Sequence, residues 1–164
     1  MVTSIKGNDT STFGANIDVT GNVVTDAPCF RASQTVAASV TGSVWTKIQL
    51  NNVNFDTTSD FDNITNYRYT PSVAGYYHID FQVEINNASI DRVVGSIYKN
   101  GTESYILSNY VNATNALLYP SAIGSGLIYM NGTTDYLELY VNSSNTANTG
   151  TARVFMNAHL ARAV

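Results

Sequence analysis

The sequence predicts an all-β fold in a single domain. From Val44 onward apolar and polar residues alternate with a period of two, no segment keeps a 3.6-residue apolar stripe, and turn residues separate the alternating runs. A chain of 164 residues is long enough to bury one sizeable core. Short strands at such spacing are typical of a β-sandwich.

The clearest strand follows the turn residues Pro71 and Gly75. Every second residue from Tyr77 to Ile85 is apolar. The residues between them are polar: His78, Asp80, Gln82 and Glu84. We expect the apolar row to face the core and the polar row to face solvent. The alternative is a metal site, which would need further ligands, because side chains two apart on a strand lie roughly 6.6 Å from each other.

Other strands follow along the chain. Alternation indicates strands at residues 44–50 and 137–141, and a continuous apolar run indicates one at residues 93–98. Asn-Gly pairs and a Ser-Asn-Thr-rich segment at residues 142–150 are turn signals. The last segment, residues 151–164, has apolar or small side chains on both faces, so we expect it to be buried on both sides against a second partner.

Residues 1–26 are expected to form a separate amino-terminal arm. They are rich in Gly, Asn, Thr and Asp, with only short apolar pieces, so they cannot bury a core alone. We expect them to serve attachment or trimerisation, by winding with copies of themselves or by packing on another protein. Residues 27–164 then form the head.

Composition argues against several partners. Eight Lys and Arg residues stand against twelve Asp and Glu residues without a basic cluster, so we expect no nucleic-acid partner. No run approaches the roughly 18 apolar residues of a membrane span, and residues 1–26 lack the apolar stretch of a signal peptide. The single cysteine, Cys29, cannot form an internal disulfide. We expect a buried thiol, with a bridge between subunits as the alternative.

Catalytic and metal-binding motifs are also missing from the sequence. It contains no G-x-S-x-G, no H-E-x-x-H and no phosphate-binding glycine loop, so we predict neither enzyme activity nor a cofactor. Paired carboxylates of a glycosidase are the one arrangement that only the fold can test. Asp56, Asp60, Asp62 and Asn63 could offer oxygen ligands to calcium, but they lack the EF-hand spacing, so we expect turn-forming aspartates.

One spacing pattern resembles a family signature. The residues Leu50, Asp56, Phe61, Tyr69 and Gly75 are separated by five, four, seven and five residues. Two further pieces fit: A-P-C-F-R-A at residues 27–32 and I-Y-K-N-G at residues 97–101. The pattern resembles the C1q-like globular head family, whose fold is the jelly roll shared with tumour necrosis factor. That family has phenylalanine where this chain has Leu50 and Tyr69, and one residue fewer between Phe61 and Tyr69.

The resemblance covers residues 27–164 and implies a ten-stranded jelly-roll sandwich assembled as a homotrimer. We expect six residues at the trimer interface: Tyr67, Tyr69, Ile123, Phe155, Met156 and His159. His159 would lie near the threefold axis, hydrogen-bonded in the interface or, as the alternative, holding an anion or a metal ion. The arm is similar in style to G-N-I-D-V-T-G pieces that precede such heads in bacteriophage fibre and other virion structural proteins.

The predicted ligand site is a long loop. Counting strands places three connections, residues 71–75, 99–120 and 142–150, at the end of the sandwich away from the arm. The middle connection carries aromatic and amide side chains suited to sugars or weakly charged protein surfaces: Tyr105, Tyr110, Asn112, Asn115 and Tyr119. The alternative is a loop that only covers the sandwich or the trimer seam.

These observations predict a trimeric phage protein on the virion surface, at a fibre tip or on the capsid. It would attach to a host-surface glycan or protein, and other virion proteins would contact residues 1–26. Family resemblance is specific for fold and weak for function, because members bind very different partners. Two alternatives stay open: a purely structural capsid decoration protein without a ligand, and a secreted, extracellular C1q-like binding module.

Overall fold

The computed structural model describes residues 26–86, 92–110, 119–151 and 153–164, with the backbone alone for residues 104–110. The predicted arm therefore lies outside the described residues, except for Asp26. The described residues form thirteen β-strands and no α-helix, which confirms the all-β class. The described residues therefore contain no helix that is long and apolar enough to cross a membrane.

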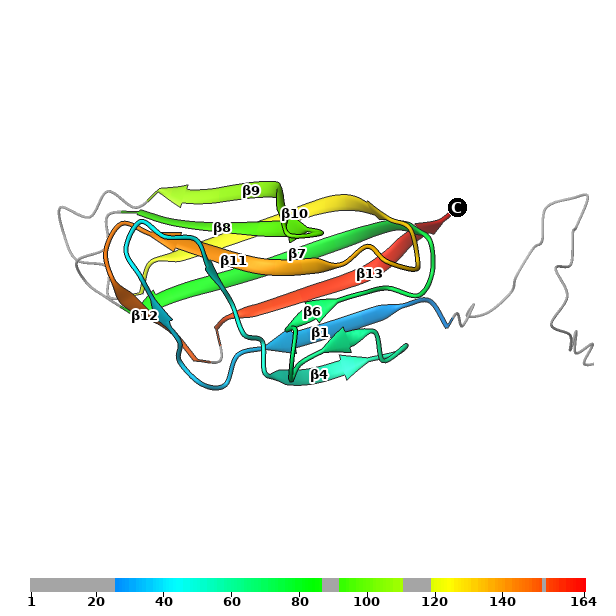
Figure 1. Ribbon diagram of the computed structural model, residues 1–164, viewed down its shortest axis with the longest axis horizontal. Helices are drawn as coiled ribbons and strands as arrows, with labels where there is room; N and C mark the ends of the chain where they lie inside the picture. The colour runs from blue at the N-terminus through cyan, green and yellow to red at the C-terminus, as the bar shows by residue number, and fades with distance from the viewer. Residues whose placement is uncertain (1–25, 87–91, 111–118, 152) are drawn as a thin grey trace, which may run out of the picture.

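The strands form two antiparallel sheets that pack face to face (Figure 1). The seven-stranded sheet contains β1 (Cys29–Ser33), β2 (Ser39–Val40), β4 (Asn52–Asp56), β7 (Gly75–Asn86), β10 (Ser121–Met130), β12 (Ala147–Thr149) and β13 (Phe155–Ala163). The six-stranded sheet contains β3 (Thr46–Lys47), β5 (Phe61–Asp62), β6 (Arg68–Tyr69), β8 (Arg92–Lys99), β9 (Thr102–Tyr110) and β11 (Leu137–Ser143). In the seven-stranded sheet β7 is central, since it pairs with β10, β12 and β13.

The core lies between the sheets and follows the alternation of the strands. The apolar row of β7 is buried as predicted, with exposed fractions of 0 to 2% from Tyr77 to Ile85. Leu137, Leu139 and Val141 of β11 face this row from the other sheet and are completely buried. Burying one such side chain stabilises the fold by roughly 1.5–3 kcal/mol relative to leaving it exposed.

The strand count differs from the ten that the resemblance implies. Five of the thirteen strands are only two or three residues long: β2, β3, β5, β6 and β12. The predicted strands at residues 93–98 and 137–141 are confirmed as β8 and β11. The one expected at residues 44–50 is reduced to the two residues of β3, although Ile48 and Leu50 still pack in the core.

The predicted long loop at residues 99–120 was wrong, because β9 occupies nine of its residues. Asn100 and Gly101 form a tight turn with positive φ angles of 55° and 75°, as the Asn-Gly signal predicts. The chain then pairs back along β8, with Tyr105 opposite Ile97 and Tyr110 opposite Arg92. Tyr105 and Tyr110 therefore lie on an edge strand.

This extra strand changes which connections share an end of the sandwich. We call the end of the sandwich where β1 begins and β13 ends the arm end (Figure 1). There, Ala163 pairs with Gly75, and the Val164 N–H donates a hydrogen bond to the carbonyl of Ala74. Residues 71–75 therefore lie at the arm end, not away from it. The opposite end holds the last residues of β7 and β9, the first residues of β8 and β10, and residues 143–147.

Candidate functional site

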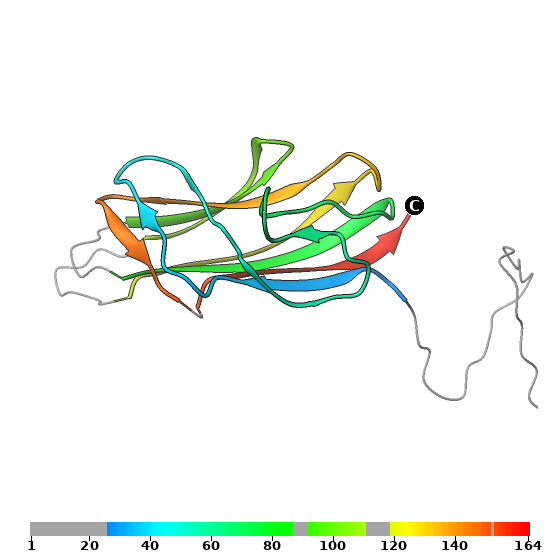
Figure 2. The same cartoon turned by 60° about the horizontal axis from the view of Figure 1, so that its bottom comes forward.

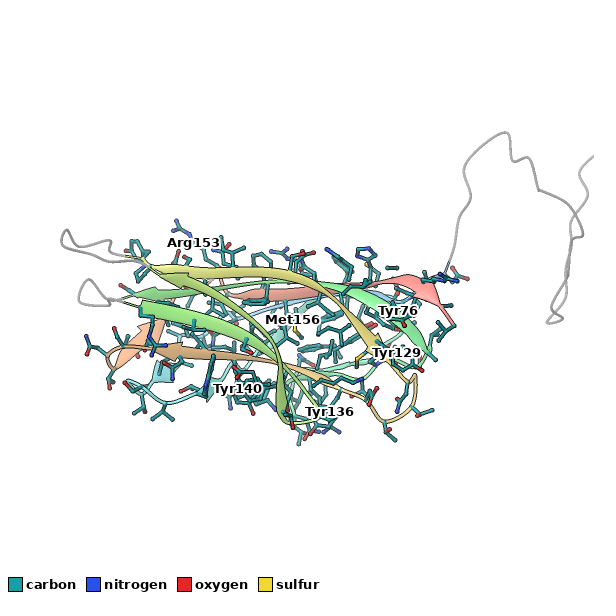
Figure 3. The ribbon with its side chains drawn as sticks, turned by 90° about the horizontal axis from the view of Figure 1, so that it is seen from above. Tyr76, Tyr129, Tyr136, Tyr140, Arg153 and Met156 are labelled. Atoms are coloured by element: carbon teal, nitrogen blue, oxygen red, sulfur yellow. The ribbon has the colours of Figure 1, made fainter. Side chains whose placement is uncertain are left out.

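Two neighbouring strands of the seven-stranded sheet expose four large apolar side chains on one face. They come from β7 and β10 and are 41 to 62% exposed: Tyr76, Ile123, Leu127 and Tyr129. We call this set the apolar face. The rings of Tyr76 and Tyr129 lie side by side with centroids 5.5 Å apart (Figure 3). Because β7 and β10 alternate strictly, the inward residues fill the core while these point away from it.

Strand pairing extends this face onto β13. Ile123 lies opposite Gln82, which in turn lies opposite Phe155. The Phe155 ring is half-buried, and the guanidinium of Arg31 lies 4.1 Å from its centroid. The surface is therefore apolar at β10 and mixed at β13, where Phe155 is covered by a cation.

A histidine pair lies two rows further along the same face. Leu127 is opposite His78, and His78 is opposite His159, with the two imidazole centroids 5.3 Å apart. The Ser125 hydroxyl lies 3.0 Å from Nε2 of His78, and Nδ1 of His78 lies 3.5 Å from the Asp80 carboxylate. No cluster of three or more His, Cys, Asp or Glu side chains suited to a metal ion occurs in the described part of the chain.

The structure divides the six predicted interface residues. Ile123, Phe155 and His159 lie on the exposed side of the seven-stranded sheet. Tyr69 and Met156 do not, because both are completely buried in the core of the single chain (Figure 3 labels Met156). Their place at an interface was a wrong prediction. Tyr67 lies before β6, beside a separate pocket.

The last strand also differs from its prediction. Met156 and Ala158 face the core, while Asn157 is half-buried and His159 is exposed on the other side. In the single chain β13 is therefore buried on one face only. Cys29, opposite His159, is likewise half-buried, not the fully buried thiol that was expected.

At the opposite end, Tyr119 borders a hollow of about 300 Å³ between the end of β7 and residues that precede β13, among them Arg153. The Arg153 guanidinium donates to the Glu84 carboxylate at 3.0 Å and lies 5.8 Å from the Tyr119 ring centroid. Glu84 belongs to the polar row that we expected to be solvated, but its side chain is buried here by this contact. The hollow thus presents one exposed aromatic ring beside an internally paired charge.

The other predicted ligand residues are not brought together with Tyr119. Tyr105 and Tyr110 lie on β9, where only the backbone is described. Asn112 and Asn115 lie outside the described residues. Sequence reasoning missed the ion pair of Glu84 with Arg153, because only the pairing of β7 with the last strand brings residues 69 positions apart into contact.

The aspartate cluster serves the turns, as expected. Asp62 accepts hydrogen bonds from the backbone N–H groups of residues 64, 65 and 66. These bonds, led by those from Thr65 and Ile64, lower the pKa of the Asp62 carboxyl to about 2. Asp56 likewise accepts from the backbone of Thr58 and Phe61.

The outer face of the six-stranded sheet pairs its polar and aromatic groups internally. Tyr98 stacks on Tyr140 with centroids 4.0 Å apart, and burial raises the pKa of both hydroxyls. The Lys47 ammonium donates to the Glu138 carboxylate beside them. Among the strand side chains that the structure describes, the exposed apolar ones therefore concentrate on the seven-stranded sheet.

Comparison with known proteins identifies the fold. No family model and no curated protein matches the sequence. Among solved structures the chain is similar to Eiger TNF from S. frugiperda, with a TM-score of 0.65 and 8% identity over 84% of this chain and 94% of that one. It is also similar to murine APRIL, with a TM-score of 0.63 and 10% identity over 82% of this chain and 98% of that one. At these identities the likeness defines a TNF-like jelly roll, which confirms the fold implied by the C1q-like resemblance.

Proposed function

We propose that this chain is the subunit of a homotrimeric jelly-roll head without enzyme activity, displayed on a virion surface. The observation that supports the proposal is the apolar face. Ile123 and Leu127 are more than half exposed in the single chain, and exposed apolar patches with polar surroundings mark interaction sites. The C1q-like resemblance implies a homotrimer, and the apolar face offers such an assembly a surface to bury.

Attachment to a host-surface glycan or protein is the proposed task of the head. Both ends of the described chain lie at the arm end, so residues 1–26 would contact other virion proteins there. The opposite end, with Tyr119 exposed, is then directed away from the virion. Three copies of it on one trimer would convert weak single contacts into useful avidity.

The variant Ile123→Asp tests trimer formation, and Ile64→Asp is its matched control. Ile123 is 62% exposed and lies on the apolar face, whereas Ile64 is 78% exposed and lies in the loop after β5. Burying an unpaired charge at an interface costs several kcal/mol, so I123D should dissociate the trimer and leave each head folded. Native mass spectrometry and light scattering report the mass, and circular dichroism reports the fold.

I64D should remain a trimer of wild-type stability. A wild-type protein that is monomeric at micromolar concentration would overturn the proposal. So would an I123D variant that keeps the trimer mass, since the apolar face would then lie outside the interface.

A purely structural decoration protein is the second candidate. It is favoured by the pairing of Arg153 with Glu84, because these two charges neutralise each other instead of meeting a partner. The Tyr119→Ala variant separates the two candidates. In an attachment protein it should weaken host-cell binding and leave the trimer mass unchanged. A wild-type trimer that binds no host cells, and lies between capsid subunits in whole-virion images, would favour the structural function.

A further inference from the structure

A polar pocket of about 530 Å³ lies on the side of the sandwich, away from the apolar face. The segment between β2 and β4, cyan in Figure 2, runs there from the seven-stranded sheet to β3 in the six-stranded sheet and back. Residues 34–39 form one wall, residues 46–51 form the other, and Tyr67 lines the pocket as well. Its volume is within the range of roughly 300–1,000 Å³ that small-molecule sites span.

Hydrogen bonds fix both walls of the pocket. The Gln34 N–H donates to the carbonyl of Val154 at 2.9 Å, and the Ala38 N–H donates to the Thr149 hydroxyl at 2.9 Å. On the other wall, the Asn51 carboxamide exchanges two hydrogen bonds with Thr35. The pocket is therefore formed in advance of any ligand.

Two features of the pocket lower the stability of the folded protein. Gln34 is only 1% exposed, yet its Oε1 finds no hydrogen-bond partner among the described residues, a loss of roughly 1–3 kcal/mol for a buried polar group. Tyr67 has a φ of +48°, a left-handed conformation that costs a non-glycine residue roughly 1–2 kcal/mol. Backbone strain of the kind found at Tyr67 concentrates at binding sites.

The pocket offers hydrogen bonds and little net charge. Lys47 is its one charged lining residue, and its ammonium already pairs with Glu138. The side chains of Ser39 and Gln49 make no hydrogen bond within the described part of the chain and are exposed, so they are free to bind. Hydroxyl and carboxamide groups both donate and accept hydrogen bonds, and the Tyr67 ring adds an apolar surface.

These groups suit a neutral ligand that carries many hydroxyls on a partly apolar ring. An anion would meet a lysine that is already neutralised, and an apolar ligand would leave the carboxamides without partners. We propose that the pocket binds a neutral hexose, either free or as one residue of a glycan. The hydroxyls of the sugar would reach Ser39 and Gln49, and its C–H face would pack on Tyr67.

The binding itself does not depend on the trimer, although its use in attachment rests on the proposed function. Saturation-transfer NMR with the full chain, and D-glucose, D-galactose and D-mannose each at about 10 mM, detects binding with a Kd near or below that value. At least one hexose should bind. Glucuronate, which adds a carboxylate to the same ring, should bind more weakly.

Three variants locate the site. Gln49→Ala and Tyr67→Gly should each lower the hexose affinity about tenfold or more. Tyr67→Gly should also keep or raise the melting temperature, because glycine adopts a positive φ without strain. Gln82→Ala is the control, because Gln82 lies opposite Ile123 on the seven-stranded sheet, away from the pocket. This variant should bind the hexose like the wild type.

Absence of hexose binding would overturn the pocket proposal, as would unchanged affinity in both pocket variants or equal binding of glucuronate. Light scattering of the same samples keeps the two proposals separate. A trimer that binds no hexose contradicts only the pocket. A monomer that binds one contradicts only the trimer.

Discussion

Removing one oxygen atom from Tyr69 tests its placement in the core. The Tyr69 ring is completely buried. It stacks on the Phe30 ring with centroids 4.1 Å apart and lies edge-on to the Tyr77 ring with centroids 5.9 Å apart. Its hydroxyl lies near the hydroxyl of Tyr77 but makes no hydrogen bond of normal geometry among the described residues. Tyr69→Phe keeps the rings and removes a desolvated polar group, so the free energy of unfolding should stay the same or rise by up to about 1 kcal/mol. The variant also restores the residue of the C1q-like pattern.

The same substitution changes the response to alkali. Burial raises the pKa of Tyr69 far above its usual value near 10, and raises that of Tyr77 to about 12. Above about pH 10 the unfolded tyrosines release protons that the folded protein retains, so stability is complete below that pH and falls as the pH rises. Each such tyrosine contributes about 1.4 kcal/mol of loss per pH unit, and Tyr69→Phe removes one of them.

Urea unfolding at neutral pH and in a series from about pH 9 to about pH 12 measures both effects. Light scattering should give the same mass for the variant and the wild type. A destabilisation beyond about 1 kcal/mol at neutral pH would mean that the hydroxyl has a partner after all. An unchanged alkaline slope, or a changed subunit number, would contradict the burial of Tyr69 within one chain.

Two further predictions concern packing and turns. Gly95→Ala should lower the free energy of unfolding by about 1–3 kcal/mol, because the added Cβ would lie 2.3 Å from the Phe81 ring. The double variant with Phe81→Leu should lose less stability than the sum of the losses in the two single variants. Urea titrations of all three variants measure this coupling. Asp62→Ala should cost about 1 kcal/mol at neutral pH by removing the acceptor for three backbone N–H groups. Because the folded pKa of Asp62 is lowered, its stabilisation is present above about pH 4, so melting curves of variant and wild type should converge as the pH falls to about 2.

The sequence predicts best the strands whose alternation is unbroken. β7 was placed correctly because five apolar residues occur at every second position. β9 was missed because Ile106 and Leu107 interrupt the alternation, and a register shift between Ile97 and Tyr98 lets the two strands pair nonetheless. An irregularity of that kind depends on the neighbouring strand, which the local sequence does not contain.

Neighbouring apolar residues show the same limit at the candidate site. Phe155 and Met156 are adjacent and both apolar, so the sequence alone does not say which of them faces inward. The register decides it: Met156 lies opposite Phe81, which is in the core, and Phe155 lies opposite Gln82, which is outside. The pocket at Gln34 was beyond prediction for a related reason, since its walls come from three separate segments of the chain.

The position of the two ends of the described part of the chain sets how the head responds to mechanical force. β1 and β13 are antiparallel neighbours, and the chain enters and leaves them at the arm end. Tension between the two ends would separate these strands one hydrogen-bonded pair at a time, which requires little force. A load between the arm and the opposite end instead runs along the strands, so many hydrogen bonds resist it together. A particle held through this head would be anchored in its mechanically strong direction.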